Sequence, residues 1–209
     1  MRKLSDISVT NKTVALRADL NVPVKEGIIL DDSRIEAVIP TVKYLLTKNC
    51  KIILMSHFGR PKAGTFDPQA SLQPIARRIG EMLNQEVDFI SAIKDVKFKS
   101  TISLLENTRF LIGELENNEE LSKNLGSMAE VYVFDAFGTA HREQASTYGA
   151  IYQANVSCAG LLLEAEIEAL TKAIHSNDKP LLSIVGGSKV STKLEVLKNL
   201  SQFSDHIIT

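Results

Sequence analysis

The sequence contains little cysteine. Only two cysteines occur among its 209 residues, and Cys50 and Cys158 lie far apart, each within an apolar segment. This arrangement is neither a disulfide framework nor the close spacing of a zinc site. We therefore expect two buried free thiols. Such thiols fit a reducing compartment, and we predict a cytoplasmic protein.

The sequence also lacks a long hydrophobic run. No apolar stretch approaches the ~18 residues that a membrane span needs. The N-terminal segment MRKLSD has no apolar region behind its basic residues. We therefore expect a soluble protein with no membrane partner.

Neither sign of charge dominates. Lysine and arginine together number 24, and aspartate and glutamate 25, so the formal net charge is −1. A near-neutral chain is not a general binder of polyanions. Its 8 phenylalanines and 4 tyrosines do not interleave with basic runs. We expect no nucleic-acid partner, and any anion site must come from local clustering of basic residues.

Several motifs of well-known enzyme classes are absent. The sequence has neither the G-x-G-x-x-G fingerprint of dinucleotide-binding domains nor the G-x-S-x-G elbow of α/β-hydrolases. Its 4 histidines and 2 cysteines form no zinc spacing. These absences disfavour a nicotinamide-dependent oxidoreductase, and we predict no metal ligands in this chain.

The composition is that of an ordinary globular protein, with 44% apolar and 23% charged residues. Surface scaling predicts that roughly 70% of the surface of the unfolded chain is buried on folding. At ~150 residues per domain, the length predicts one domain, or one domain and a piece of another.

Short β-like runs alternate with segments of helical periodicity. One such segment carries apolar residues at Ile35, Val38, Val42 and Leu45. The predicted strands are residues 13–18, 51–56, 87–90, 101–105, 131–134, 181–185 and 206–209. This alternation predicts an α/β fold, a three-layer α/β/α Rossmann-like parallel sheet.

Three polar residues are predicted to cap helices. Ser33 has Glu36 three residues later, which is the pattern of a capping box. Ser71 and Asn118 each precede an apolar segment of helical period. We therefore expect helices to begin directly after these three residues.

Basic and polar residues follow the predicted strands, and ligands of open α/β sheets bind beyond the carboxyl ends of their strands. Arginine favours bidentate recognition of phosphate or carboxylate. We predict a small ligand that carries both groups; solvated, unrelated arginines remain the alternative. We expect Asp135 to hold its loop rather than to react. The candidate residues are Asp19, Asn21, Arg34, His57, Arg60, Arg109 and Arg142.

A second candidate phosphate site lies between Gly186 and Lys193, where a strand, two glycines and a helix follow one another. Glycines let backbone N–H groups approach a phosphate at a helix N-terminus, and Lys189 and Lys193 add positive charge. The lysine follows the glycines too closely for a Walker motif. Two surface lysines on an amphipathic helix remain the alternative interpretation.

Five long motifs together resemble one family. They occur in family order and are Arg17–Pro23, Ser56–Pro61, Glu106–Phe110, Asp135–Arg142 and Gly186–Lys193. The chain closely resembles phosphoglycerate kinase, a glycolytic enzyme of two Rossmann-like lobes, and the likeness covers essentially the whole chain.

The resemblance implies a domain organisation. Residues 1–163 would form the phosphoglycerate-binding lobe, the first lobe of a two-lobe kinase. Residues 164–179 would form an interdomain helix, and residues 180–209 would begin a truncated nucleotide-binding lobe. Because the family continues past this position, we expect the chain to be a fragment, inactive alone and monomeric in full-length form.

The resemblance also implies site residues and a reaction. The reaction is reversible phosphoryl transfer between 1,3-bisphosphoglycerate with ADP and 3-phosphoglycerate with ATP. It needs Mg²⁺, whose contacts, like most nucleotide contacts, are expected in the missing lobe. Arg34, Lys189 and Lys193 would be catalytic. The nucleotide would contact Gly186, Gly187, Lys189 and Lys193. The implied 3-phosphoglycerate site comprises Asp19, Leu20, Asn21, Arg34, His57, Phe58, Gly59, Arg60, Arg109 and Arg142.

A non-catalytic module that binds phosphate esters remains the alternative function. It would use the same arginine residues without turnover. We expect the two hypotheses to be distinguished by whether the parent reading frame continues after Thr209.

Overall fold

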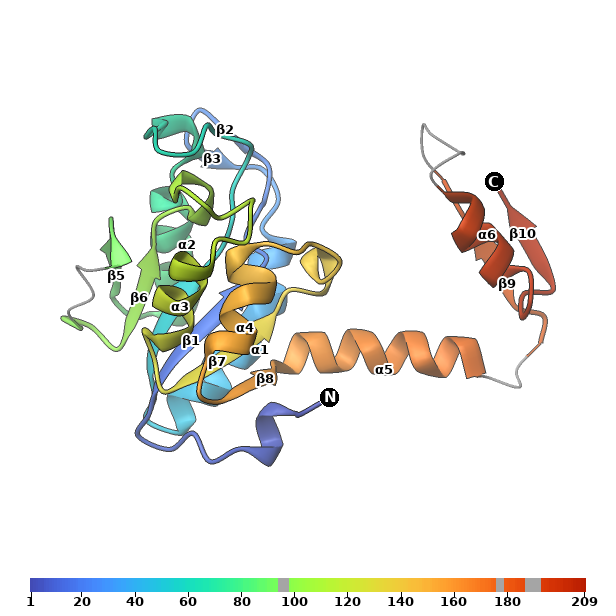
Figure 1. Ribbon diagram of the computed structural model, residues 1–209, viewed down its shortest axis with the longest axis horizontal. Coiled ribbons are helices and arrows are strands. Elements are labelled where there is room, and N and C mark those ends of the chain that lie inside the picture. The colour runs from blue at the N-terminus through green and yellow to red at the C-terminus, as the bar shows by residue number, and fades with distance from the viewer. Residues whose placement is uncertain (94–97, 176–178, 187–192) are drawn as a thin grey trace. The chain divides into compact units, whose positions relative to one another are not determined.

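The structure is a computed structural model that describes residues 1–93, 98–175, 179–186 and 193–209 (Figure 1). Contacts divide the chain into two compact units, Met1–Ala165 and Glu166–Thr209. The domain boundaries expected after residues 163 and 179 stay predictions.

The first unit is built on one sheet of six strands in the order β5-β6-β4-β1-β7-β8. Every neighbouring pair in it is parallel. The strands are β1 (Thr13–Ala18), β4 (Lys51–Met55), β5 (Val87–Ile90), β6 (Ile102–Leu105), β7 (Val131–Asp135) and β8 (Ser157–Ala159). The predicted α/β fold with a parallel sheet is confirmed. The short strand β8 was not predicted.

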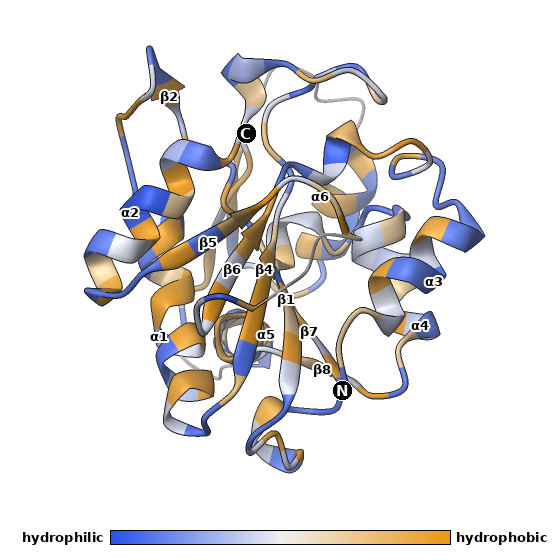
Figure 2. Ribbon diagram, turned by 90° about the vertical axis from the view of Figure 1, so that its left-hand side faces the viewer, coloured by the Kyte–Doolittle hydropathy of each residue, from blue (hydrophilic) through white to orange (hydrophobic). Residues whose placement is uncertain are grey.

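Helices cover both faces of this sheet. Helices α1 (Ser33–Thr47) and α2 (Gln73–Leu83) lie on one side of the strands, and α3 (Glu119–Ser127) and α4 (Ala150–Gln153) on the other (Figure 2). Short 3₁₀ turns occupy Leu4–Asp6, Pro68–Ala70, Thr108–Phe110 and Phe137–Thr139, and a π-helical turn occupies Ala145–Gly149.

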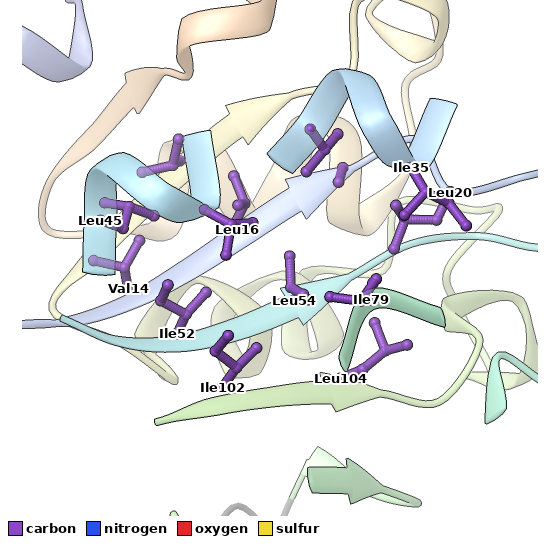
Figure 3. Packing of buried hydrophobic residues seen from close by; sticks show 14 of the residues in the cluster. Val14, Leu16, Leu20, Ile35, Leu45, Ile52, Leu54, Ile79, Ile102 and Leu104 are labelled. Atoms are coloured by element: carbon purple, nitrogen blue, oxygen red, sulfur yellow. The ribbon is translucent and has the colours of Figure 1, made fainter. Parts of the chain in front are cut away.

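The alternation of side chains along the strands produces two cores. In β1, Val14 and Leu16 belong to the core under α1 and α2, whereas Ala15 belongs to the core under α3 and α4. Figure 3 shows the first core, where aliphatic side chains of the strands meet those of the two helices. Its labelled residues are Val14, Leu16, Leu20, Ile35, Leu45, Ile52, Leu54, Ile79, Ile102 and Leu104.

Only one of the three predicted helix caps is confirmed as written. The Asn118 side chain accepts a hydrogen bond from the N–H of Leu121 at 3.0 Å. Ser33 instead is the first residue of α1, and its own N–H donates to Asp31 Oδ1 at 2.9 Å. Ser71 lies two residues before α2, where its hydroxyl accepts from the N–H of Gln73 at 3.2 Å.

A small hairpin joins β1 to α1. Strands β2 (Val24–Lys25) and β3 (Ile28–Ile29) pair antiparallel. The two residues between them, Glu26 and Gly27, have φ of 52° and 77°. Two-residue hairpin turns of type I′ require positive φ at both positions, which explains glycine there.

Both cysteines are buried and free, as predicted. The Cys50 thiol donates to the carbonyl of Val9 at 3.0 Å. Burial raises the pKa of both thiols, that of Cys158 to about 12.

The second unit contains one βαβ arrangement. Strands β9 (Leu182–Ile184) and β10 (His206–Ile208) pair in parallel, and α6 (Leu194–Leu200) lies between them in sequence. Helix α5 (Leu161–His175) begins in the first unit and continues into the second. Among the described residues of this unit, no hydrophobic side chain is fully buried.

Within the described ranges, no helix has both the length and the apolar character needed to cross a bilayer.

The core under α1 and α2 generates a stability prediction. Leu54 is fully buried in β4, whereas Leu30 is 64% exposed. We expect Leu54→Ala to lower the free energy of unfolding by about 2–5 kcal/mol, because it removes buried contacts and leaves a cavity. The matched exposed variant, Leu30→Ala, should change it by less than about 0.5 kcal/mol. Urea unfolding measures both, and equal effects would contradict the assigned core.

Candidate functional site

Four neighbouring strands, β6, β4, β1 and β7, end at the same edge of the sheet. Because they are parallel, the loops that follow them start side by side. These loops carry all but one of the residues expected at the 3-phosphoglycerate site, and Arg34 lies at the start of α1.

The loop after β1 contacts both α1 and the loop after β4. Asp19 Oδ2 accepts from Arg34 Nη1 at 2.9 Å, and Asp19 Oδ1 accepts from the N–H of Asn21 at 3.2 Å. Asn21 Oδ1 accepts from the N–H of Gly59 at 2.9 Å. The N–H of Leu20 donates to Ser56 Oγ at 2.9 Å. These bonds join the loop after β1 to the loop after β4, so two of the predicted parts of the site lie together.

A buried asparagine holds the loop after β4. Asn107 Oδ1 accepts from the N–H of Phe58 at 2.9 Å, and its Nδ2 donates to the carbonyls of Phe58 and Ala70 at 2.7 and 2.8 Å. Gly59, which follows, has a φ of +56°. Its carbonyl accepts a hydrogen bond from the Arg109 guanidinium. Sequence reasoning placed Asn107 in a motif but missed this role.

Glu106 fixes the start of α2 to the same edge. Its Oε1 accepts from the N–H groups of Leu72 and Asn107 at 2.9 and 2.8 Å, and its Oε2 accepts from the Ser71 hydroxyl at 2.8 Å. A carboxylate that accepts several hydrogen bonds while 8% exposed acts as a structural anchor. Sequence reasoning placed Glu106 in a motif but did not predict this anchoring role.

His57 is only 2% exposed and lies between two arginines. Its Nδ1 is 3.3 Å from Arg17 Nη2, and its Nε2 is 3.3 Å from Arg142 Nη1. Burial first, and then the charges of Arg17 and other arginines, lower the pKa of His57 to about 2. The imidazole is therefore neutral at physiological pH.

Arg17 is fully buried on the face of the sheet that α3 and α4 cover. Its Nε donates to Ser146 Oγ at 2.9 Å, and its guanidinium also donates to the carbonyl of Ala18. Burial lowers the pKa of Arg17, and the buried Glu114 opposes this effect. Arg17 belongs to a quoted motif, but it was not predicted as a site residue.

The cluster carries more positive than negative charge. Among the described residues, no carboxylate oxygen lies within 4.0 Å of a guanidinium nitrogen of Arg60, Arg109 or Arg142, whereas Arg34 pairs with Asp19 at 2.9 Å. Burial and the neighbouring arginines lower the pKa of Arg109. Such a surplus of guanidinium groups suits an anionic ligand with several acceptor oxygens.

Asp135 is fully buried at the end of β7 and joins three elements. Its Oδ2 accepts from the Thr41 hydroxyl of α1 at 2.6 Å, and its Oδ1 accepts from the N–H of Leu163 in α5 at 2.8 Å. Burial raises the pKa of Asp135, while these hydrogen bonds lower it. Both oxygens therefore serve the scaffold, which agrees with the expected holding role.

The second candidate phosphate site is only partly described. Lys193 donates from its ammonium group to the carbonyl of Gly186. Gly187 and Lys189 lie outside the described residues. The nucleotide-binding and catalytic roles of these positions stay predictions.

The described ranges contain no group of three or more His, Cys, Asp or Glu side chains that could hold a metal ion. The donor set for the expected Mg²⁺ is therefore not found among them.

Comparisons with known proteins agree with the geometry. A family model described as phosphoglycerate kinase matches residues 4–209. Two curated proteins named phosphoglycerate kinase, from Desulfovibrio desulfuricans and Haemophilus influenzae, are 47% and 49% identical, each over 99% of this chain. Those alignments cover 53% and 54% of the two relatives. The chain thus spans about half the length of the curated relatives it matches.

Two solved structures are similar as well. The phosphoglycerate kinase of Coxiella burnetii is 43% identical with a TM-score of 0.89, over 98% of this chain and 53% of that chain. That of Pyrococcus horikoshii is 36% identical with a TM-score of 0.86, over 99% of this chain and 54% of that chain.

The buried, neutral His57 generates a pH prediction. Its folded pKa of about 2 lies below the unfolded value of 6.5, so only the unfolded state binds the proton as the pH falls. Its contribution to stability is present above pH ~6.5 and is lost on acidification. We expect the free energy of unfolding to fall more steeply in the wild type than in His57→Gln, by up to about 1.4 kcal/mol per pH unit.

Urea unfolding at pH 7, 6 and 5 measures this difference. His141→Gln is the control, since His141 is exposed, and it should follow the wild type. Parallel curves for the wild type and His57→Gln would contradict the neutral buried state.

Proposed function

The chain belongs to the phosphoglycerate kinase family, and from that premise we propose that its arginine cluster binds 3-phosphoglycerate. The observation that carries the proposal is the surplus of guanidinium groups around a neutral His57. Arg60, Arg109 and Arg142 have no carboxylate partner within 4.0 Å among the described residues. Three unpaired cations at one edge of the sheet match a ligand with a phosphate and a carboxylate.

Each side chain has a separate part in this proposal. The phosphate and the carboxylate of the ligand are bound by Arg34, Arg60, Arg109 and Arg142. The His57 ring donates a hydrogen bond to one of these groups without adding charge. Asp19 and Asn21 face the ligand hydroxyl group or orient the loops. The backbone of Leu20, Phe58 and Gly59 adjoins the ligand. Asp19 also holds Arg34, whose side chain is 53% exposed.

The proposed reaction is reversible phosphoryl transfer. A carboxylate oxygen of 3-phosphoglycerate forms a bond to the γ-phosphorus of ATP, and the bond from that phosphorus to the bridging oxygen of ADP breaks. No covalent intermediate with the protein is needed, so positioning and charge stabilisation supply the catalysis. Arg34, Lys189 and Lys193 would stabilise the charge on the transferring group, and Gly186 and Gly187 would approach the nucleotide phosphates. Mg²⁺ would neutralise charge on the nucleotide.

The proposed organisation follows the family. Residues 1–163 bind the acid, 164–179 connect, and 180–209 begin a nucleotide-binding lobe. The division of contacts after Ala165 lies close to the first boundary and supports it. We propose a cytoplasmic protein that acts as a monomer in full-length form on these small molecules.

Binding of 3-phosphoglycerate tests the site. We expect the 209-residue polypeptide to bind it and Arg142→Ala to bind it about 10- to 150-fold more weakly, because a charge-assisted hydrogen bond of about 1.5–3 kcal/mol is lost. Binding should also weaken with salt. Arg77→Ala, which removes an exposed arginine of α2 outside the cluster, is the matched control. Calorimetry that finds equal affinities for Arg142→Ala and Arg77→Ala would remove Arg142 from the site.

Turnover separates the kinase from a non-catalytic binding module. We expect the 209-residue polypeptide to bind 3-phosphoglycerate without turning over ATP, because it spans about half the length of its relatives. Positioning two reactants contributes about 7–11 kcal/mol to lowering a barrier. Joining these residues in cis to the second half of a relative should restore turnover in a coupled assay. A joined protein that binds the acid but stays inactive would favour the binding module.

A further inference from the structure

A buried carboxylate and a serine lie behind the arginine cluster. Glu114 is 1% exposed, and Ser146 is fully buried in the π-helical turn. Glu114 Oε2 accepts from the N–H of Ser146 at 3.0 Å, and Glu114 Oε1 accepts from its hydroxyl. Tyr132 donates from its hydroxyl to the carbonyl of Ser146 at 2.6 Å. Ser146 is thus held on three sides.

These bonds fix the direction of the Ser146 hydroxyl. A hydroxyl has one proton to donate and lone pairs to accept with. Because its proton goes to Glu114, a lone pair faces Arg17 Nε, which donates to it at 2.9 Å. Arg17 is in this way anchored through Ser146 to a carboxylate that it does not touch.

Arg17 in turn limits the protonation of His57. Arg17 Nη2 lies 3.3 Å from His57 Nδ1, and Arg142 Nη1 lies 3.3 Å from His57 Nε2. Guanidinium nitrogens can only donate, and a neutral imidazole has one acceptor nitrogen. Only one of the two arginines can therefore donate to His57, and the other faces an N–H group.

The burial of the two arginines decides which of them donates to His57. Arg17 is fully buried, so an N–H of His57 facing it would leave donors without acceptors and without water. Arg142 is partly exposed, so its guanidinium can donate to solvent instead, and an oxygen of a ligand bound there could accept from both Arg142 and a facing His57 N–H. The less costly arrangement has an unprotonated Nδ1 and the hydrogen on Nε2.

We propose that Glu114 and Ser146 are positioning residues, which hold Arg17 so that His57 presents an Nε2–H donor next to Arg142. This inference rests on the proposed function only where it concerns the ligand. An oxygen of 3-phosphoglycerate between His57 and Arg142 would then accept from both. His57 and Arg142, which face each other with two donors, would in this way form a binding site for one anionic group.

Nitrogen-15 NMR of the histidine rings tests the tautomer without any ligand. In the wild-type 209-residue protein at pH 7, the His57 signals, identified by their loss in His57→Gln, should show an unprotonated Nδ1 and a protonated Nε2. A protonated Nδ1, or an imidazolium ring, would overturn the proposal.

Ser146→Ala tests the positioning role. It removes the hydroxyl acceptor of Arg17 but keeps the backbone bond to Glu114. We expect the His57 signals to move toward a mixture of tautomers and the affinity for 3-phosphoglycerate to fall about tenfold. Ser122→Ala is the matched control: Ser122 is 2% exposed in α3, and its hydroxyl donates to Asn117 at 3.3 Å. It should leave both readouts unchanged.

The remaining outcomes are also decisive. Unchanged ring signals and affinity in Ser146→Ala would overturn the role of Ser146. If that variant does not fold, Glu114→Gln replaces it under the same criteria, since the amide keeps the shape and removes the charge. Wild-type protein that binds no 3-phosphoglycerate would refute the proposed function, whereas the ring spectrum would still decide the tautomer.

Discussion

The burial of the Arg17 guanidinium against the face of the sheet that α3 and α4 cover is the constraint on which the site depends. A charge that is 0% exposed must find acceptors in the protein, because leaving it unpaired costs several kcal/mol. The acceptors come from three places: the Ser146 hydroxyl, the Ala18 carbonyl and the His57 ring. Satisfying Arg17 therefore fixes the π-helical turn, the end of β1 and the loop after β4 together.

A neutral histidine among arginines follows from the same constraint. A charged imidazole beside Arg17 would add a cation where one is already buried, and burial with neighbouring arginines holds the pKa of His57 near 2. The neutral His57 ring contributes a directional hydrogen-bond donor and does not repel the neighbouring guanidinium groups. The exposed arginines can then supply the charge that attracts an anionic ligand, while the buried one supplies geometry.

The sequence predicted the features that depend on local pattern. Alternation located β1, β4 and β7, and parallel order brought Asp19, His57 and Arg142 to one edge. It missed residues whose roles depend on distant partners: Arg17 meets Ser146 across 129 positions, and Asn107 meets Phe58 across 49. No periodicity or cap signals such contacts. The capping box at Ser33 failed because Asp31, outside the expected pattern, bonds the Ser33 N–H.

The chemical reactivity of the two buried thiols reports when parts of the first unit open. Burial raises the pKa of the Cys50 and Cys158 thiols and shields both from alkylating reagents, which react with exposed thiolates. Cys50 directly precedes the interior strand β4, whereas Cys158 lies in the edge strand β8. Labelling of Cys50 therefore requires the buried segment between α1 and β4 to open, and labelling of Cys158 requires β8 to separate from its surroundings. The two thiols can thus report the opening of two different places in the first unit.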